Sequence, residues 1–493
     1  MTARCVMVLG TTSGAGKSWL ATALCRWYAR QGLRVAPFKA QNMSNNARVV
    51  EGGEIGSAQY FQALAARAVP EVRMNPLLLK PERDTHSQVV LFGQVDAALT
   101  AQPWRARSES VWPRIAAALD ALREENDVVV IEGAGSPAEI NLKDSDIVNM
   151  RVARHADAAC LLVTDIDRGG AFAHLYGTWA FLDEDERRLL RGFVLNKFRG
   201  DASLLAPAPQ LLEQRTGVPT LATLPMWWQH GLPEEDGVFD DRGSAGSGAV
   251  TRTVAVVACP RISNLDEFQP LKRVPGLALR WVRTPAELAG LEVGDWIVLP
   301  GSKNTSGDLA WLRAQGLDAA IGAHAARGGA VLGICGGLQM LGEALIDPHG
   351  IDGNAPGLGL LPLVTQFEPA KTVRRTSAQF TALQGAWSAL SGVAVAGYEI
   401  RHGHTVQHAG MQPGRAVLPG GLGWQNAEGN VLGVYLHGLF EDPAVLHALF
   451  GATAPTLDSV FDELADFIDT HFAPGVLHGV AVANLVAGNR DAG

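Results

Sequence analysis

The stretch Val8–Ser18 reads VLGTTSGAGKS and decides the architecture of the first part of the chain. It overlaps the end of an apolar run, Cys5–Leu9, that is typical of a short buried strand, and apolar residues recur at helical spacing after it. A glycine-rich loop between a strand and a helix holds phosphates well, because its backbone N–H groups and the helix N-terminus point at the anion. The pattern therefore predicts a phosphate-binding P-loop.

The residues expected to bind nucleotide are consecutive: Thr12, Ser13, Gly14, Ala15, Gly16, Lys17 and Ser18. Lys17 would reach the terminal phosphates and the Ser18 hydroxyl would ligate magnesium, so ATP and Mg²⁺ are the expected cofactors. Five residues separate Gly10 from Gly16, one more than in the usual pattern. This longer loop resembles the dethiobiotin-synthetase-like branch of P-loop proteins, which implies phosphorylation of a carboxylate. A tight turn with a surface lysine is the alternative.

The composition excludes several classes of protein. The 493 residues, 47% hydrophobic and 18% charged, are typical of a soluble protein with two or three domains. A net charge of −9 argues against general nucleic-acid binding. No apolar run approaches the ~20 residues that span a bilayer, and the first strand begins too early to leave room for a signal peptide. Five widely spaced cysteines, an odd number, indicate reduced thiols and a cytoplasmic location.

Short apolar runs bounded by turn or polar residues recur between helical stretches through the first part of the chain. We expect strands there at Arg34–Phe38, Asp127–Ile131, Ala158–Val163, Gly192–Leu195 and Val218–Leu224. A second rhythm of the same kind comprises Thr253–Ala258, Leu277–Val282, Trp296–Leu299, Ala330–Ile334 and Leu432–Leu436. The sequence therefore predicts an α/β fold with two doubly wound, mostly parallel-sheet domains.

The domain boundaries follow from changes in composition. Residues 231–250 are acidic and then rich in glycine and serine, which is typical of an interdomain linker. We expect a P-loop domain at 1–230, a second domain at 251–450 and a helical extension at 451–493. Within the extension, the apolar spacing predicts an amphipathic helix around Leu457–Phe472.

Polar residues beyond the strand ends are candidate ligands, because α/β sheets bind ligands beyond the carboxyl ends of their strands. Glu132 follows a predicted strand and would hold magnesium with Ser18, with the capping of a loop as the alternative. Glu54 lies downstream of the polar run that begins at Lys39 and is a further candidate metal ligand, unless this region is a solvated loop. Asn196 follows another strand, where its amide would read adenine.

A second polar segment, NLKDSDIVN at Asn141–Asn149, lies downstream of Glu132. If Glu132 holds magnesium, Asp146 would flank the terminal phosphate and help to position the carboxylate that is activated. Direct contact with an anionic substrate would be repulsive, so Asp146 would act through magnesium or a bound backbone. An Asx turn or a helix cap in this segment is the alternative.

The stretch Ala330–Leu341, AVLGICGGLQML, carries the chemistry of the second domain. An apolar strand delivers Cys335 between glycines, and a helical stretch follows, which is the pattern of a nucleophile elbow with cysteine in place of serine. The helix N-terminus favours the thiolate, and the backbone N–H of Gly336 would serve an oxyanion hole. A buried cysteine in a glycine-rich bend is the alternative.

A thiolate nucleophile needs a base, and His437 is the histidine placed directly after an apolar strand. Alone, such a histidine is more often structural, but in the same domain as Cys335 it becomes the favoured base. His402 and His404, in the segment YEIRHGHT, are the competing candidates.

The elbow resembles the C-x-G-x-Q elbow of class I glutamine amidotransferases. The resemblance implies that Cys335 attacks the side-chain amide of glutamine, that Gln339 contacts this substrate, and that Gly301 belongs to the second oxyanion loop. Most members carry His-x-Glu, whereas here Gly438 and Leu439 follow His437, and the first acidic residue is Glu441. The third member of the triad is therefore left open. The cobyric and cobyrinic acid amide synthases share this departure from His-x-Glu.

The two halves together resemble the cobyric acid synthase family along nearly the whole chain, in KAQNMSNNA, GGEIGSAQ, EGAGSPAEINL, LPGSKNT, GYEIRHGHT and YLHGLFED. The resemblance implies ATP- and glutamine-dependent amidation of the b, d, e and g carboxylates of a corrinoid, adenosylcobyrinic acid a,c-diamide. The alternatives are the synthase that makes the a,c-diamide and a regulatory P-loop ATPase with an inactive amidotransferase-like module. The oligomeric state stays open, a homo-oligomer included.

Overall fold

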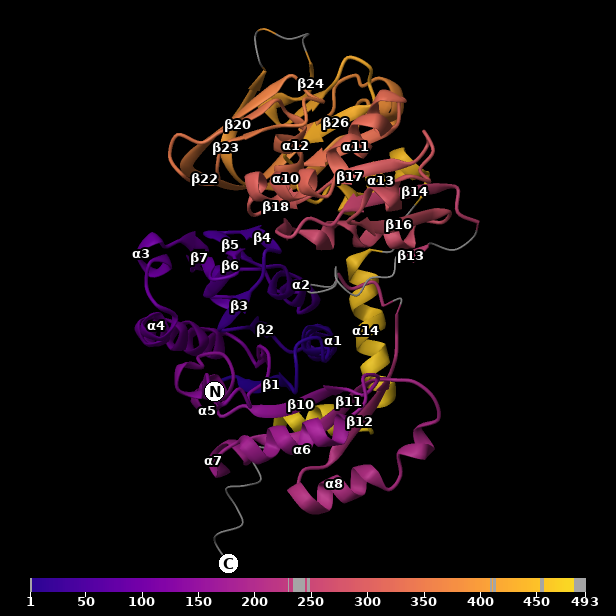
Figure 1. Ribbon diagram of the computed structural model, residues 1–493. Helices are drawn as coiled ribbons and strands as arrows, with labels where there is room; N and C mark the ends of the chain where they lie inside the picture. Colours follow the sequence, from indigo (N-terminus) through magenta and orange to yellow (C-terminus); the bar gives the residue numbers. More distant parts are fainter. Residues whose placement is uncertain are drawn as a thin grey trace, which may run out of the picture.

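A computed structural model describes residues 2–228, 230–233, 244–245, 249–407, 410, 414–452 and 456–482 (Figure 1). Two α/β bodies lie one above the other in this view, and the strands β4 and β5 of the first body lie at the boundary with the second. Most of the predicted linker, 231–250, falls outside the described residues. Within the described part of the chain, no helix combines the length and the apolarity needed to cross a membrane.

The first domain is built on a parallel six-stranded sheet with the order β12-β11-β10-β1-β9-β2. Alternate residues of the central strand β1 face opposite sides: Val6 and Val8 join one apolar cluster, and Met7 and Leu9 join the other. The strands are β1 (Arg4–Gly10), β2 (Val35–Phe38), β9 (Val128–Glu132), β10 (Ala159–Asp165), β11 (Leu190–Phe198) and β12 (Thr220–Pro225).

Helices cover both faces of this sheet, as expected for a doubly wound fold. One face packs against α1 (Lys17–Arg30), α2 (Ser57–Ala65) and α14 (Leu457–His471). The other packs against α4 (Trp104–Glu125), α5 (Met150–Ala156), α6 (Ala171–Phe181) and α8 (Ala208–Thr216). The short helices α3 (Ala97–Thr100) and α7 (Glu184–Arg187) complete the domain.

The C-terminal helices return to the first domain. The predicted amphipathic helix is present as α14, whose buried Phe461 and Leu464 join the cluster that contains Leu20 and Leu24 of α1. The Trp27 indole donates to Asp469 (Nε1–Oδ1, 2.7 Å), and the Tyr28 hydroxyl donates to a carbonyl in α15 (Val476–Val482). The two described helices of the segment predicted as an extension, α14 and α15, therefore pack into the core of the P-loop domain.

The second domain is built on an eight-stranded sheet with the order β13-β16-β14-β17-β19-β26-β25-β24. Its central strands are parallel: β16 (Leu277–Val282), β14 (Arg252–Val257), β17 (Trp296–Leu299), β19 (Ala330–Ile334) and β26 (Val431–Val434). The edges are antiparallel: β13 (Ser244–Ala245), β25 (Gly423–Gln425) and β24 (Arg415–Leu418). The helices are α9 (Pro285–Leu288), α10 (Thr305–Ala314), α11 (Leu317–Ala326), α12 (Gly336–Leu341) and α13 (Pro443–Phe450).

Each domain also carries smaller sheets, which the strand rhythm does not predict. The first domain contributes β3 (Gln41–Met43), β4 (Ala47–Val50), β5 (Gly53–Gly56), β6 (Leu77–Arg83), β7 (His86–Leu91) and β8 (Gln94–Val95). The second contributes β15 (Ile262–Ser263), β18 (Gly301–Ser302), β20 (Ala344–Ile346), β21 (Ala355–Pro356) and the long pair β22 (Leu363–Gln379) and β23 (Ala394–Gln407). Both β22 and β23 contact β4, so this pair reaches the P-loop domain.

Candidate functional site

The P-loop connects β1 to α1, and its geometry suits an anion. Gly16, the N-cap of α1, has a φ of 99°, which favours glycine. Lys17 is buried and folds back along Gly10, where an added Cβ would lie 2.9 Å from Nζ. Lys17 Nζ donates to the carbonyl oxygens of Thr12 (3.0 Å) and Gly135 (3.2 Å). The ammonium group thus lies between the P-loop and the loop that follows β9, beside the N-terminus of α1.

Glu132, the last residue of β9, collects polar groups from several elements. Its carboxylate accepts from Ser18 (Oγ–Oε1, 2.8 Å), Lys39 (Nζ–Oε1, 2.8 Å) and Gln62 (Nε2–Oε2, 2.5 Å). Burial alone would raise the pKa of Glu132, but Lys39 and these hydrogen bonds hold the pKa below its usual range. A buried, ionised carboxylate bonded to the hydroxyl of Ser18 fits a magnesium site completed by nucleotide phosphates and water.

Asn196 lies against the P-loop, at the end of β11. Its Nδ2 donates to the carbonyl oxygen of Ala15 (2.9 Å), and an added Cβ on Gly16 would lie 2.0 Å from that nitrogen. Lys197 donates from Nζ to the carbonyl oxygen of Gly14 (2.8 Å). These contacts support the loop from one side, and the reading of adenine by Asn196 stays a prediction.

Asp146 adopts the Asx-turn arrangement that the sequence leaves open. Its Oδ1 accepts from the backbone N–H groups of Val148 (2.8 Å) and Asn149 (3.1 Å), and burial raises the pKa of its carboxyl group. The Asn149 side chain then binds both backbone groups of Ala134, next to Gly135, which accepts from Lys17. Asp146 therefore reaches the phosphate-binding region through the loop that follows Glu132.

Cys335 lies at the sharp turn between β19 and α12. Its φ of 52° and ψ of −106° are strained for a residue with a side chain, as in a nucleophile elbow. An added Cβ on Gly337 would lie 2.0 Å from the carbonyl oxygen of Leu299, so only glycine fits beside this turn. The thiol donates towards the carbonyl oxygen of Ile400 in β23 (Sγ–O, 3.6 Å).

His437 follows β26 and is held by a carboxylate. Its Nδ1 lies 3.0 Å from Glu267 Oε1, and the other oxygen of Glu267 accepts from the backbone N–H of Gly438 (2.9 Å). Burial lowers the pKa of His437, but the Glu267 carboxylate and the neighbouring Cys335 thiol outweigh it and raise the pKa to about 10. The structure therefore brings together a thiol, an imidazole and a carboxylate in one buried cluster.

Glu267 is the functional residue that the sequence analysis misses. It lies in the 3-10 helix η4 (Leu265–Arg273), 170 positions before His437. The rule that points to residues beyond strand ends would find this region, because η4 follows β14 and β15. Glu441, the acidic residue considered from sequence, instead accepts from Arg48 of the first domain (Nη1–Oε2, 2.7 Å).

The expected glutamine-binding residues surround the cysteine. An added Cβ on Gly301 would lie 2.7 Å from His437 Cε1, and one on Gly336 would lie 2.8 Å from the backbone nitrogen of Ser302. The two oxyanion segments are therefore adjacent. Gln339 Nε2 donates to the carbonyl oxygen of His402 (3.0 Å), which fixes this side chain against β23.

The competing histidines are placed differently. His404 is exposed on β23. The His402 ring approaches the carbonyl oxygen of Glu368 through Nδ1 (3.2 Å). Burial, aided by Lys371 and Lys303, lowers the pKa of His402 to about 4. The ring beside the thiol is that of His437.

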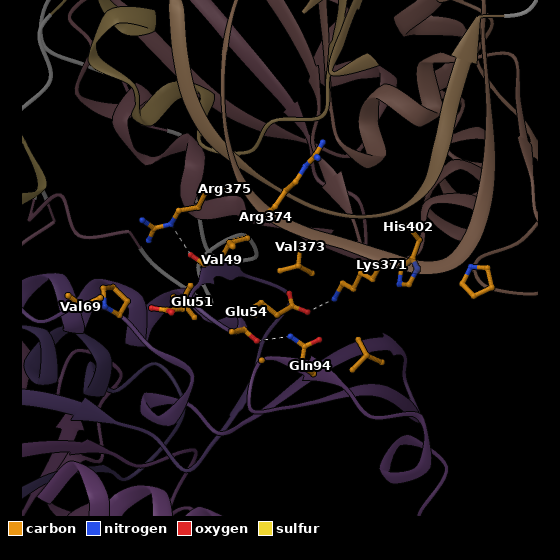
Figure 2. Close-up of a pocket in the computed structure, with 17 residues that line it drawn as sticks. Val49, Glu51, Glu54, Val69, Gln94, Lys371, Val373, Arg374, Arg375 and His402 are labelled. Carbon is orange, nitrogen blue, oxygen red and sulfur yellow. Dashed lines mark hydrogen bonds and ion pairs between the residues drawn. The ribbon is translucent and has the colours of Figure 1, made fainter. Parts of the chain in front are cut away.

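An interdomain cavity with a volume of about 930 Å³ lies between the β4–β5 hairpin and β22 (Figure 2). Glu54 of β5 forms an ion pair with Lys371 of β22 and accepts from Lys80 (Nζ–Oε2, 2.8 Å). Burial would raise the pKa of Glu54, but the two ammonium groups bring it to about 2.

Each oxygen of Glu54 thus binds a lysine, and Glu54 forms an ion pair across the domain boundary, so its role as a magnesium ligand stays a prediction. Among the described residues, no three or more His, Cys, Asp or Glu side chains are grouped to hold a metal ion. The fitting donors at the P-loop are Ser18 and Glu132, in keeping with the preference of Mg²⁺ for one or two protein ligands plus phosphates.

Comparison with known proteins matches each half to a family. Residues 6–233 match the CobQ/CobB/MinD/ParA nucleotide binding domain, and residues 253–445 match the CobB/CobQ-like glutamine amidotransferase domain. Cobyric acid synthase of Variovorax paradoxus is 81% identical over 97% of this chain and 100% of its own length. Those of Polaromonas naphthalenivorans and Albidiferax ferrireducens are each 75% identical, again over 97% of this chain and 100% of their own length. The chain therefore belongs to the cobyric acid synthase family.

Proposed function

We propose that this chain catalyses the ATP-dependent, glutamine-hydrolysing amidation of the b, d, e and g carboxylates of adenosylcobyrinic acid a,c-diamide. The product is adenosylcobyric acid, an intermediate of cobalamin biosynthesis. The observation that carries the proposal is the presence, in one chain, of a P-loop with a magnesium-type carboxylate and of a thiol–imidazole–carboxylate cluster. A carboxylate needs activation and a nitrogen source, and these two sites supply one each.

The first domain activates the carboxylate. Lys17 and the backbone of Thr12–Gly16 would bind the nucleotide phosphates, and Ser18 and Glu132 would hold magnesium. When bound, MgATP supplies the phosphoryl group that turns a carboxylate into an acylating agent. Asp146 orders the loop that carries Gly135, which places the Lys17 ammonium.

The second domain releases ammonia from glutamine. His437 holds the proton of the Cys335 thiol as an imidazolium, and the resulting thiolate attacks the side-chain amide carbon of glutamine, held near Gln339. The N–H group of Gly336 and the Gly301 loop stabilise the oxyanion, and the imidazolium returns its proton to the departing ammonia. Glu267 holds the imidazole through Nδ1, so that Nε2 faces the thiol. Water then hydrolyses the thioester.

The test is to supply the full chain with ATP, Mg²⁺ and glutamine and to compare two substrates, the a,c-diamide and unamidated cobyrinic acid. Consumption of the a,c-diamide with four successive mass changes to the fully amidated product supports the proposal. Amidation of cobyrinic acid at only its a and c positions would favour the a,c-diamide synthase instead.

The regulatory-ATPase alternative is separated by the glutaminase assay. Glutamine hydrolysis that is lost in Cys335→Ala identifies an enzyme, whereas nucleotide hydrolysis without any glutaminase would identify a binding module. Five free thiols and the use of ATP suit a cytoplasmic enzyme.

A further inference from the structure

A short segment of the first domain, Asn46–Arg48, interlocks with the segment of the second domain that immediately precedes Glu267. The backbone N–H of Ala47 donates to Asn264 Oδ1 (2.9 Å), and the backbone N–H of Leu265 donates to Asn46 Oδ1 (3.0 Å). The two segments thus exchange a reciprocal pair of hydrogen bonds across the domain boundary. Such a pair fixes the position of η4, because a one-residue slip would break both bonds.

Arg48 adds an ion-pair network to this interlock. Its side chain is 3% exposed and donates to Asp266 (Nε–Oδ2, 3.0 Å) and to Glu441 (Nη1–Oε2, 2.7 Å). Both carboxylates belong to the glutaminase domain, one in η4 and one in η7 (Leu439–Glu441). A buried arginine with two carboxylate partners has a strongly fixed geometry, since its planar fork matches both.

Two routes lead from Arg48 to the imidazole of His437. Asp266 is the neighbour of Glu267, which binds His437 Nδ1. Separately, the Arg48 guanidinium lies over the ring of Tyr398 (5.1 Å to the centroid), and that ring stacks on His437 (centroids 5.4 Å apart, interplanar angle 24°). Tyr398 and His437 also exchange backbone hydrogen bonds of 3.2 and 2.9 Å. Arg48 of the P-loop domain therefore supports both members of the His437–Glu267 pair, Glu267 through Asp266 and His437 through Tyr398.

We propose that Asn46 and Arg48 of the P-loop domain are positioning residues for the glutaminase, which is completed only when the two domains are docked. The proposal rests on the glutaminase half of the proposed function. The interdomain contacts described for Asn46 and Arg48 reach Leu265, Asp266, Glu441 and Tyr398. Their effect on the glutaminase therefore passes through Glu267, Tyr398 and His437. A shift of about 1 Å in a catalytic group costs up to about 10²-fold in rate.

The test uses Asn46→Ala and Arg48→Lys in the full chain. Asn46→Ala removes one neutral acceptor and strands no charge, and Arg48→Lys keeps the charge but loses the bidentate fork. The control is Asp84→Asn, which removes a different interdomain ion pair, between the exposed carboxylate of Asp84 and Arg261, and such an exposed pair contributes little energy. For each variant, kcat and KM for glutamine hydrolysis, amidation with ammonium salts, and the thermal midpoint are measured.

We expect kcat for glutamine hydrolysis to fall about 10- to 100-fold in both variants, with KM for glutamine and ammonia-dependent amidation close to those of the unchanged chain. Asp84→Asn should leave all of these values unchanged. Unchanged kcat in both variants would overturn the proposal, and so would an equal loss of ammonia-dependent amidation, which would indicate general misfolding. If the unchanged chain itself lacks glutaminase, the proposed function fails before any variant is compared.

Discussion

The P-loop of the first domain and the nucleophile elbow of the second are both strand–turn–helix junctions, but they hold their reactive groups in different ways. The Lys17 ammonium is bonded to two carbonyl oxygens and the Ser18 hydroxyl to Glu132, so ligands must exchange with protein contacts. The glutaminase cluster is already assembled, with Glu267 on His437 and His437 beside Cys335. The reactive groups of the first site are thus held by contacts that nucleotide and metal would have to replace, whereas the carboxylate, imidazole and thiol of the second site already lie together.

The largest effect should come from the preorganised site. We expect Cys335→Ser to reduce glutamine-dependent amidation by about 10⁴-fold or more, because the nucleophile is lost, and to leave amidation from added ammonium salts largely intact. His437→Ala should reduce glutamine-dependent amidation by a comparable factor. Measuring product formation with each nitrogen source checks this, and an equal loss with both would mean that Cys335 is structural.

The next largest effect should come from the nucleotide-binding site. We expect Lys17→Ala to reduce amidation about 10²- to 10³-fold with either nitrogen source, because a phosphate-directed charge is lost, while glutamine hydrolysis measured alone persists. Arg188→Ala, which removes an exposed cation paired with the exposed Glu184, is the control. Near-normal turnover of Lys17→Ala with ammonia at saturating ATP would contradict the assignment.

A smaller effect should come from the carboxylate that binds His437. We expect Glu267→Gln to lower kcat for glutamine hydrolysis about 10²-fold, because the imidazole loses its charged partner. Glu441→Gln should have a milder effect, since Glu441 binds Arg48 and not His437. Steady-state glutaminase assays of both variants decide between them, and the reverse order would move the acid role to Glu441.

Glu267→Gln should also change the pH dependence of glutamine hydrolysis. The pKa of His437 is raised to about 10, so the imidazolium is present at neutral pH and is lost as the pH rises through that value. Glu267→Gln removes the largest stabilising charge and therefore lowers this pKa. The alkaline limb of kcat/KM for glutamine hydrolysis should move to lower pH, which a pH–rate profile measures. A limb that stays in place would show that Glu267 does not set the charge of His437.

The smallest effect should come from Asp146. We expect Asp146→Asn to slow amidation several-fold and to release partially amidated corrinoids, because the asparagine still accepts hydrogen bonds but lacks the carboxylate charge in the Asx turn before Asn149. Glutaminase activity should be unaffected. Chromatography of products over time tests this, and an unchanged rate and intermediate pattern would limit Asp146 to the stability of its loop.

Features that depend on local sequence were predictable. The bounds of β16, β17 and β19 coincide with the expected strands, because β17 and β19 are continuous apolar runs and β16 is interrupted only by the exposed Arg280. The P-loop and the elbow are also predictable, because the glycines and the reactive side chain of each are neighbours in sequence.

Features that depend on tertiary contacts were not predictable from the sequence. The long strands β22 and β23 mix polar and apolar residues, because part of their length faces the other domain, and they show no clean alternation. Glu267 reaches His437 only through the folded sheet, and Glu54 is a polar residue whose partner, Lys371, comes from the second domain. Long-range pairing of this kind leaves no local pattern.

The interlock of Asn46–Arg48 with Asn264–Asp266 limits how the two halves of such an enzyme can be recombined. A glutaminase domain grafted from a distant relative would bring its own version of the second segment and meet a first segment that did not evolve with it. An exchanged glutaminase domain therefore has to be accompanied by the Asn46–Arg48 segment of its own parent. Chimeras joined within 231–250 should recover ammonia production only when both segments come from the same parent.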